Sequence, residues 1–309
     1  MVAERFDDID TVLKFERRIA STAAANIWLC SRDTERVVVK ELAIKRVANP
    51  AHVFNERDVL QLLTDCGFPR SPKLIGTAKS KDSVFIVMEL VDGAPLHLHL
   101  PRAGFSERIA KRYFAETLSI LEFLHSNRIV YRDLKLSNIL VRRSDGRLCL
   151  CDFGLSKTLT NDRTNSVCGT LHAMAPEIKS GAGHSFDVDY WSLGILLFEL
   201  LEGTAPFGYS NVSEERVLES PGSVLFSVGK HSEESKDLIS QLLTVDPGQR
   251  LTSFELIRQH AFFSDCNEDW WLRCRFDSVG VPDSDVPDFD SEIGREFIYG
   301  PPPDKWADF

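Results

Sequence analysis

The sequence lacks any hydrophobic run that could cross a bilayer. None of its apolar stretches approaches the ~18 residues that a membrane-spanning helix needs. The segment from Met1 to Asp8 contains neither the apolar core of a signal peptide nor a glycine for myristoylation. We therefore expect a cytoplasmic protein that does not act at a membrane, with the nucleus as the alternative location.

Basic residues and paired cysteines are also scarce. The chain carries 36 Lys and Arg against 46 Asp and Glu, a formal net charge of −10, which argues against general nucleic-acid binding. The seven cysteines are an odd number without paired spacing, so reduced thiols are expected. Cys149 and Cys151 alternate along a predicted strand, where small buried hydrophobic residues are expected rather than metal ligands.

The hydrophobic pattern predicts both helices and strands. At 309 residues, the chain is long enough for two lobes with sizeable cores. A helix is expected over residues 10–18, where Val12, Phe15 and Ile19 have helical spacing. The other predicted strands are 26–30, 36–40, 72–79 and 84–90, and the other predicted helices include 107–127, 235–243 and 254–260.

Polar residues that could carry chemistry gather in one stretch. Asp133 and Asp152 have Lys135 and Asn138 between them. A carboxylate can accept a proton, and an Asp/Asn pair can hold a divalent cation through oxygen. Such a set suits phosphoryl transfer from a magnesium nucleotide.

The local pattern explains how these groups would meet. Residues 139–142 and 148–151 are apolar runs that predict two short strands, and Ser144-Asp145-Gly146 between them is a turn signal. The hairpin would bring Asp152 back towards Asn138.

The order of these motifs resembles the protein kinases. Tyr131-Arg132-Asp133-Leu134-Lys135-x-x-Asn138 is followed by Asp152-Phe153-Gly154 and then by Ala175-Pro176-Glu177, at compatible spacing. Ordinary turn residues and a buried pair would explain this ordered set poorly. The resemblance implies an α+β fold with two lobes: a small β-rich lobe over residues 1–91, a larger and mainly helical lobe over 92–262, and a C-terminal tail over 263–309.

The resemblance also implies roles for single residues. Asp133 would accept the proton of a serine or threonine hydroxyl, and Lys135 would steady the transferring phosphoryl group. Asn138 and Asp152 would hold Mg²⁺, while Lys40, paired with Glu56, would bind the α- and β-phosphates of ATP. Further nucleotide contacts are implied at Ala20, Thr22, Ala25, Ile27, Val38, Met88, Glu89, Val91 and Leu140.

The phosphate loop is where the sequence departs most from the family. Ala20, Thr22 and Ala25 stand where the family has three glycines. Glycine there lets backbone N–H groups approach the phosphates and permits positive φ. Alanine allows part of this at a cost, and threonine allows less.

Within the kinases, the sequence resembles the AGC group, to which the cyclic-AMP-dependent protein kinase belongs. Tyr131, Cys168-Gly169-Thr170 and the tail carry this likeness. It implies that Trp306 and Phe309 dock on the small lobe beside the Glu56 helix.

A regulatory site is implied as well. Ser166 matches the phosphorylated position of the group, so an upstream activating kinase is expected. Its phosphate would pair with Arg132 and Lys157.

Two expectations concern activity. Relatives that select basic substrates place acidic residues at positions held here by Pro95 and Ser137, with His172 nearby, and only Glu199 keeps its carboxylate. A weaker demand for arginine upstream of the target hydroxyl is therefore expected. The altered phosphate loop and Val38 leave one alternative open, a pseudokinase scaffold that binds nucleotide or protein partners with little or no transfer.

Overall fold

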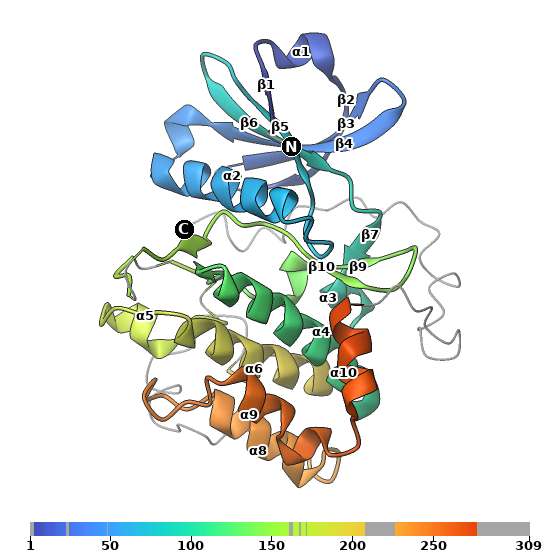
Figure 1. The fold of residues 1–309 in the computed structure, drawn as a ribbon, viewed down its shortest axis with the longest axis vertical. Helices are drawn as coiled ribbons and strands as arrows, with labels where there is room; N and C mark the ends of the chain where they lie inside the picture. Colours follow the sequence, from blue (N-terminus) through green and yellow to red (C-terminus); the bar gives the residue numbers. More distant parts are fainter. Residues whose placement is uncertain are drawn as a thin grey trace. The chain divides into compact units, whose positions relative to one another are not determined.

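The computed structural model describes residues 3–22, 25–47, 49–160, 163–166, 168–170, 172–207 and 226–276. This part of the chain forms two compact units, one ending at Asp92 and the other beginning at Gly93. The first is built on a sheet and the second is mainly helical (Figure 1). The predicted α+β class is therefore confirmed.

A six-stranded sheet forms the first unit, with the strand order β1-β5-β6-β4-β3-β2. Strand β1 runs parallel to β5, and every other pair is antiparallel. The strands are β1 (Glu4–Phe6), β2 (Lys14–Ser21), β3 (Ala25–Arg32), β4 (Glu35–Ala43), β5 (Leu74–Lys79) and β6 (Ser83–Glu89). Strands β3 and β4 contain the strands predicted over 26–30 and 36–40, and β5 and β6 match those predicted over 72–79 and 84–90 to within two residues at each end.

Two helices lie on opposite faces of this sheet (Figure 1). Successive side chains of a strand point to opposite faces. In β4, Val39 packs in the core cluster that includes Ile9 of α1 (Ile9–Val12), whereas Lys40 pairs with Glu56 of α2 (Pro50–Asp65). The sheet thus separates an apolar core on the α1 side from the ion pair on the α2 side.

The helix predicted over residues 10–18 is wrong. Helix α1 ends at Val12, and β2 begins at Lys14. From there the backbone pairs with β3, beginning with Lys14 opposite Ser31. A spacing of four residues, as between Phe15 and Ile19, fits a helix and also fits the alternation of a strand. Pairing with β3 decides between them, because it satisfies the backbone of the whole segment.

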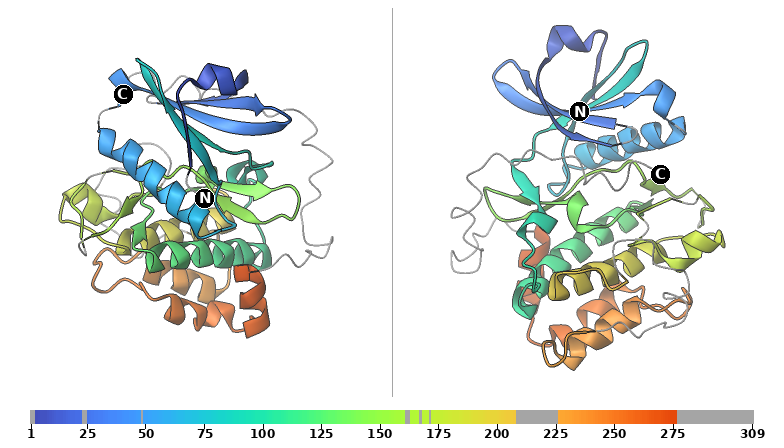
Figure 2. Two further views of the ribbon diagram at one scale, coloured as in Figure 1. Left: turned by 45° about the horizontal axis from the view of Figure 1, so that its top comes forward. Right: turned by 180° about the vertical axis from the view of Figure 1, so that it is seen from behind.

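The second unit is organised around α6 (Asp187–Glu202), whose residues from Val188 to Glu202 are all buried. A helix that is buried on every side belongs to the centre of a core. Figures 1 and 2 show α6 between α4 and α8. The remaining helices are α3 (Leu96–His99), α4 (Glu107–Ser126), α5 (Pro176–Ser180), α8 (Glu233–Leu242), α9 (Phe254–Arg258) and α10 (Glu268–Phe276).

Short strands of the second unit carry the predicted hairpin. Strand β9 (Ile139–Arg142) pairs with β10 (Leu148–Leu150) and with β7 (Gly93–Pro95). A separate pair joins β8 (Ile129–Val130) to β11 (Lys157–Thr158). Gly146 has φ 65° in the hairpin turn, a conformation that favours glycine, so the Asp145-Gly146 signal predicted this turn correctly.

Within the described ranges, no helix combines the length and the apolar character that a membrane crossing requires. All seven cysteines lie in these ranges and none is in a disulfide. Among the same residues no group of three or more His, Cys, Asp or Glu could hold a metal ion. Cys149 is buried and Cys151 is half-buried. The predicted docking of Trp306 and Phe309 lies outside the described residues.

Candidate active site

Asp133 lies between β8 and the short 3-10 helix η2 (Leu136–Asn138), and three side chains fix its carboxylate. Its Oδ2 accepts a hydrogen bond from Asn138 Nδ2 at 2.8 Å and lies 2.9 Å from Lys135 Nζ. Its Oδ1 accepts from the Thr170 hydroxyl at 2.5 Å, and Lys135 Nζ donates to that hydroxyl at 2.7 Å. The carboxylate is therefore oriented to accept a hydrogen bond from an alcohol, as the contact with Thr170 demonstrates.

The loop that carries Asp133 is fixed from below by a buried carboxylate. Asp189 accepts hydrogen bonds from the backbone N–H groups of Tyr131 and Arg132 at 2.9 and 2.8 Å, and its Oδ2 lies 2.8 Å from His125 Nε2. Asp189 is fully buried. The same contacts hold the backbone of Arg132 at φ 68°. A residue other than glycine adopts this left-handed conformation only when its surroundings impose it.

Asn138 and Asp152 are the two candidate metal ligands, and the hairpin brings their backbones together. The N–H of Cys151 donates to the carbonyl of Asn138 at 2.9 Å, so Asp152 is one residue from that contact. Asn138 Nδ2 donates both to the carbonyl oxygen and to Oδ2 of Asp133. Because these two bonds use both protons of the amide, its oxygen is the atom suited to a cation.

Lys40 and Glu56 form the corresponding site of the first unit. Lys40 Nζ lies 2.6 and 2.9 Å from the two carboxylate oxygens of Glu56, and both residues are buried. Glu56 faces inward because α2 buries it together with Val59, Leu60 and Leu63. A buried charge-assisted pair of this kind holds the lysine extended from β4 in a defined direction.

The predicted phosphate loop is the hairpin between β2 and β3. Ala20 pairs with Ile27, and Ser21 pairs with Asn26, so these residues belong to the strands. Thr22 N–H donates to the carbonyl of Ala25 at 2.8 Å and closes the turn. Residues 23 and 24 lie outside the described ranges.

The remaining nucleotide positions are spread over both units. In the first unit, Val38 is opposite Met88 in the β4–β6 register, and the Glu89 N–H donates to the carbonyl of Lys73 at 2.9 Å. In the second unit, Leu140 lies in β9 opposite Pro95 of β7. Ile27, Val38, Met88, Val91 and Leu140 are all half-buried.

The segment that carries Ser166 contacts the loop that carries Asp133. Arg132 Nη1 donates to the Ser166 hydroxyl at 2.5 Å, and its Nε donates to the carbonyl of Leu155. Lys157 Nζ donates to the hydroxyl of Thr164 at 2.8 Å rather than to Ser166. The hydroxyls of Thr164 and Ser166 are 3.3 Å apart. Arg132 and Lys157 thus converge near Ser166, one directly and the other through a threonine.

Sequence reasoning missed the direct contact of Thr170 with Asp133. The residue before Thr170 makes this approach feasible, since Gly169 has φ 127° and an added Cβ would lie 3.0 Å from the carbonyl oxygen of Arg132. Only glycine combines that conformation with so close an approach. The glycine before Thr170 indicates a close approach of the backbone at this point. The sequence does not indicate that Asp133 is the residue that Thr170 contacts.

Among the predicted substrate-selecting residues, the structure brings two together. Glu199 of α6 is buried, and His172 Nε2 lies 3.9 Å from its Oε1. Burial, followed by the charge of Lys135, lowers the pKa of His172 below its ordinary value. At pH 7 a neutral imidazole therefore lies beside the carboxylate that the family resemblance assigns to basic substrates.

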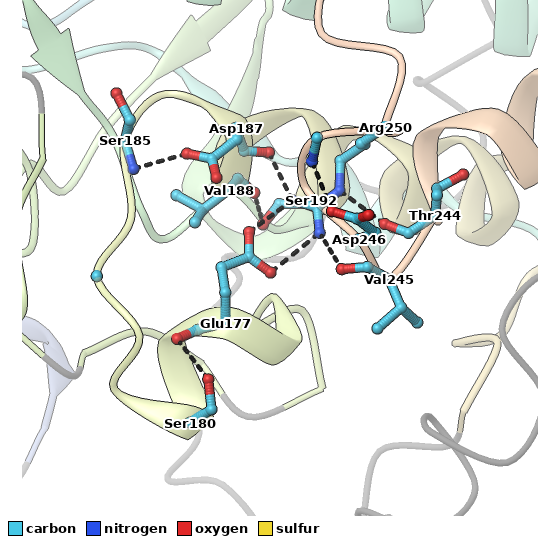
Figure 3. A network of polar contacts seen from close by, with 12 residues as sticks. Glu177, Ser180, Ser185, Asp187, Val188, Ser192, Thr244, Val245, Asp246 and Arg250 are labelled. Carbon is cyan, nitrogen blue, oxygen red and sulfur yellow. Dashed lines mark hydrogen bonds and ion pairs between the residues drawn. The ribbon is translucent and has the colours of Figure 1, made fainter.

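A bidentate ion pair braces the lower part of the second unit (Figure 3). Arg250 Nη1 and Nη2 lie 2.6 and 3.0 Å from the two carboxylate oxygens of Glu177. Arg250 also donates to the carbonyls of Asp187, Thr244 and Val245. The side chain of Arg250 is completely buried, so all of its hydrogen bonds are made inside the protein.

We expect the stability of the protein to fall when the pH is lowered from 7 towards 5. Burial, followed by the charge of Arg132, lowers the pKa of His184 below 6.5, although Asp187, Glu177 and Asp189 oppose this. The unfolded chain then binds a proton that the folded chain does not. The stabilisation is complete above about pH 6.5 and is lost as the pH falls through the lowered pKa, with a slope of at most ~1.4 kcal/mol per pH unit.

Urea unfolding at pH 7.5, 6.5 and 5.5 measures this loss. The variant His184→Phe keeps a buried ring but cannot titrate, so its free energy of unfolding should depend less on pH. An identical pH dependence in the variant and the parent would contradict this assignment.

Comparison with known proteins agrees with the geometry. Residues 15–263 match the family model described as protein kinase domain. The serine/threonine-protein kinase gad8 of Schizosaccharomyces pombe is 37% identical over 282 residues, which cover 86% of this chain and 48% of that protein. Protein kinase 2 of Dictyostelium discoideum is 40% identical over 225 residues, covering 71% and 45%.

A third relative is the serine/threonine-protein kinase SCH9 of Saccharomyces cerevisiae. It is 37% identical over 248 residues, which cover 77% of this chain and 30% of that protein. The chain spans less than half the length of each of these three relatives.

Proposed function

Because the chain belongs to the protein kinase family and its relatives belong to the AGC group, we propose that it is a serine/threonine protein kinase that transfers the γ-phosphoryl group of ATP to protein hydroxyls. The observation that carries this proposal is the environment of Asp133. Asn138, Lys135 and Thr170 hold its carboxylate in the orientation in which it accepts a hydrogen bond from an alcohol.

The residues present fit ATP and magnesium. Protein kinases use ATP with Mg²⁺, which neutralises the charge that develops on the phosphates. Lys40, held by Glu56, would bind the α- and β-phosphates, and Asn138 and Asp152 would bind the metal ion. The orientation of the Asn138 amide supports this, because its oxygen is the atom left by the two hydrogen bonds to Asp133.

Each catalytic side chain has a defined task. Asp133 would orient the substrate hydroxyl and accept its proton, and Lys135 would stabilise negative charge on the transferring group. Most of the barrier reduction in this type of reaction comes from positioning and charge stabilisation. The contacts of Asp133 and the anchoring of its loop by Asp189 supply such positioning.

The nucleotide base and the phosphates would be bound by the positions that the resemblance implied. The phosphates would lie against the β2–β3 hairpin. Backbone groups near the end of β6 would bind adenine, and half-buried apolar side chains would enclose the ring. These residues are Ala20, Thr22, Ala25, Ile27, Val38, Met88, Glu89, Val91 and Leu140.

Ser166 would be the site of activation by an upstream kinase. A phosphate on this hydroxyl would bind Arg132, which already donates to it, and would be near Lys157. Charge-assisted bonds to a phosphate are stronger than those to a hydroxyl, so phosphorylation would order the segment further. The docking of the tail through Trp306 and Phe309 stays a prediction.

The demand for basic substrates would be weaker than in related kinases. Pro95 and Ser137 supply no carboxylate, and His172 lies against Glu199. A peptide-library scan that shows strong selection of upstream arginine would contradict this.

The scaffold alternative rests on Ala20, Thr22 and Ala25, which replace the glycines of the phosphate loop. A poorer loop would lower the rate without removing a chemical group. The ion pair of Lys40 and the contacts of Asp133 favour transfer over the scaffold.

Nucleotide binding tests the proposal without reliance on turnover. We expect 1 mM ATP with magnesium to raise the melting temperature by a few degrees, since a ligand at about ten times its Kd stabilises by roughly 1.4 kcal/mol. Asp152→Ala should remove the magnesium dependence of this shift. No shift with ATP in the parent protein would overturn nucleotide use, and binding without transfer would favour the scaffold.

A further inference from the structure

The hairpin between β2 and β3 contains a hydrogen bond that the sequence did not foreshadow. The hydroxyl oxygen of Thr22 accepts from the backbone N–H of Ala25 at 3.0 Å, and the hydroxyl itself lies 3.3 Å from the carbonyl of Ala25. The backbone N–H of Thr22 also donates to that carbonyl at 2.8 Å. Thr22 therefore occupies both backbone polar groups of Ala25.

The strands on either side hold this hairpin firmly. The Ser21 hydroxyl donates to Asn26 Oδ1 at 2.9 Å, and Asn26 Nδ2 donates to Glu41 Oε2 at 3.3 Å. Glu41 also accepts from the Trp28 indole at 2.9 Å and from the Ser83 hydroxyl at 3.1 Å. These hydrogen bonds join the base of the hairpin to β4 and β6. They fix the strand ends that carry the hydrogen bond between Thr22 and Ala25.

Position 25 matters because it corresponds to a glycine of the phosphate loop. In such loops the backbone N–H groups are the donors that bind phosphate oxygens. Here the Ala25 N–H already donates to the hydroxyl of Thr22. The glycine that the family has at position 22 has no side chain that could accept this hydrogen bond. A phosphate oxygen would have to displace the Thr22 hydroxyl before it could accept from this N–H.

We propose that Thr22 is a positioning residue that weakens nucleotide binding by holding, with its hydroxyl, the Ala25 N–H that would otherwise bind a phosphate oxygen. The inference rests on the proposed function, because it assumes that ATP is the ligand of this hairpin. The effect on ATP affinity is expected to be modest, because the Ala25 N–H exchanges its hydrogen bond to the Thr22 hydroxyl for one to a phosphate oxygen. The net free energy of one such hydrogen bond corresponds to about a fivefold change in affinity.

The substitution Thr22→Val tests the role of the hydroxyl alone, since valine keeps the branched shape and the backbone N–H. Its Kd for ATP with magnesium, measured by isothermal titration calorimetry, should be about fivefold lower than that of the parent. Thr22→Ser keeps the hydroxyl and should bind ATP as the parent does.

Adenosine provides the decisive control, because it has no phosphate. Its Kd should be the same for the parent, Thr22→Val and Thr22→Ser. In turnover assays the gain should appear in KM for ATP, with kcat almost unchanged, whereas a merely structural role would move ATP and adenosine together.

The possible failures are distinguishable. Equal or weaker ATP binding by Thr22→Val, in a protein with the parent's melting temperature, would overturn the inference and leave the proposed function intact. An equal gain for adenosine and ATP would also overturn it. Absence of ATP binding by all three proteins would overturn the proposed function itself.

Discussion

Replacing Asp133 with asparagine should lower kcat about 10³-fold and leave the Kd for ATP nearly unchanged. A positioned general base contributes roughly 10²–10⁴-fold, and asparagine cannot accept a proton. The loss corresponds to ~4 kcal/mol of transition-state stabilisation. Asparagine is nearly isosteric and can still accept the hydrogen bond from Asn138, so the loop should keep its shape.

The measurement is steady-state phosphorylation of a generic serine substrate, accompanied by calorimetric binding of ATP. Asp145→Asn is the matched control, because it removes a carboxylate from the β9–β10 turn of the same unit. That variant should keep the parent's kcat. Turnover of Asp133→Asn at the parent's rate would contradict the role assigned to this carboxylate.

Replacing Arg250 with methionine should lower the free energy of unfolding by about 3–5 kcal/mol. Methionine fills similar space but leaves the Glu177 carboxylate buried without its cation, which is the costly way to break a buried pair. The three backbone carbonyls that now accept from Arg250 would lose their donor as well. The melting temperature should fall by roughly 10 °C.

Three further variants test whether the loss of stability comes from the pair of Arg250 with Glu177. Lys236→Ala breaks the exposed pair with Glu233 and should cost less than ~0.5 kcal/mol. Arg250→Lys keeps the charge but not the bidentate geometry, so its loss should be intermediate. The double variant Glu177→Gln/Arg250→Met should lose less than the sum of its single variants. A cost for Arg250→Met as small as that of Lys236→Ala would contradict the bracing role.

Much of the second unit could be predicted because its signals are local. Apolar runs around an Asp-Gly turn predicted strands over residues 139–142 and 148–151, and the strands of the structure are 139–142 and 148–150. Helix α4 begins at Glu107, as predicted, and ends within one residue of the predicted bound. The pairing of Lys40 with Glu56 followed from the family resemblance rather than from the local pattern.

The features that escaped prediction depend on partners distant in sequence or on side-chain geometry. The segment from Lys14 became a strand because β3 pairs with it, and no local pattern shows that partner. Thr170 lies 37 positions from Asp133, which it contacts. The hydrogen bond between Thr22 and Ala25 joins residues that are close in sequence. Comparison with the family pattern identifies the missing glycine, but it does not show that the Thr22 hydroxyl accepts a hydrogen bond from the Ala25 N–H.

The central claim is that the groups around Asp133 perform phosphoryl transfer. Its most direct test is the transfer of radiolabelled γ-phosphate from ATP to a generic serine- and threonine-containing protein, with Asp152→Ala as the inactive control. The account predicts labelled phosphoserine or phosphothreonine with the parent protein and none above background with the variant. Mg²⁺-dependent ATP binding by the parent without any labelled substrate, or equal labelling by the variant, would contradict it.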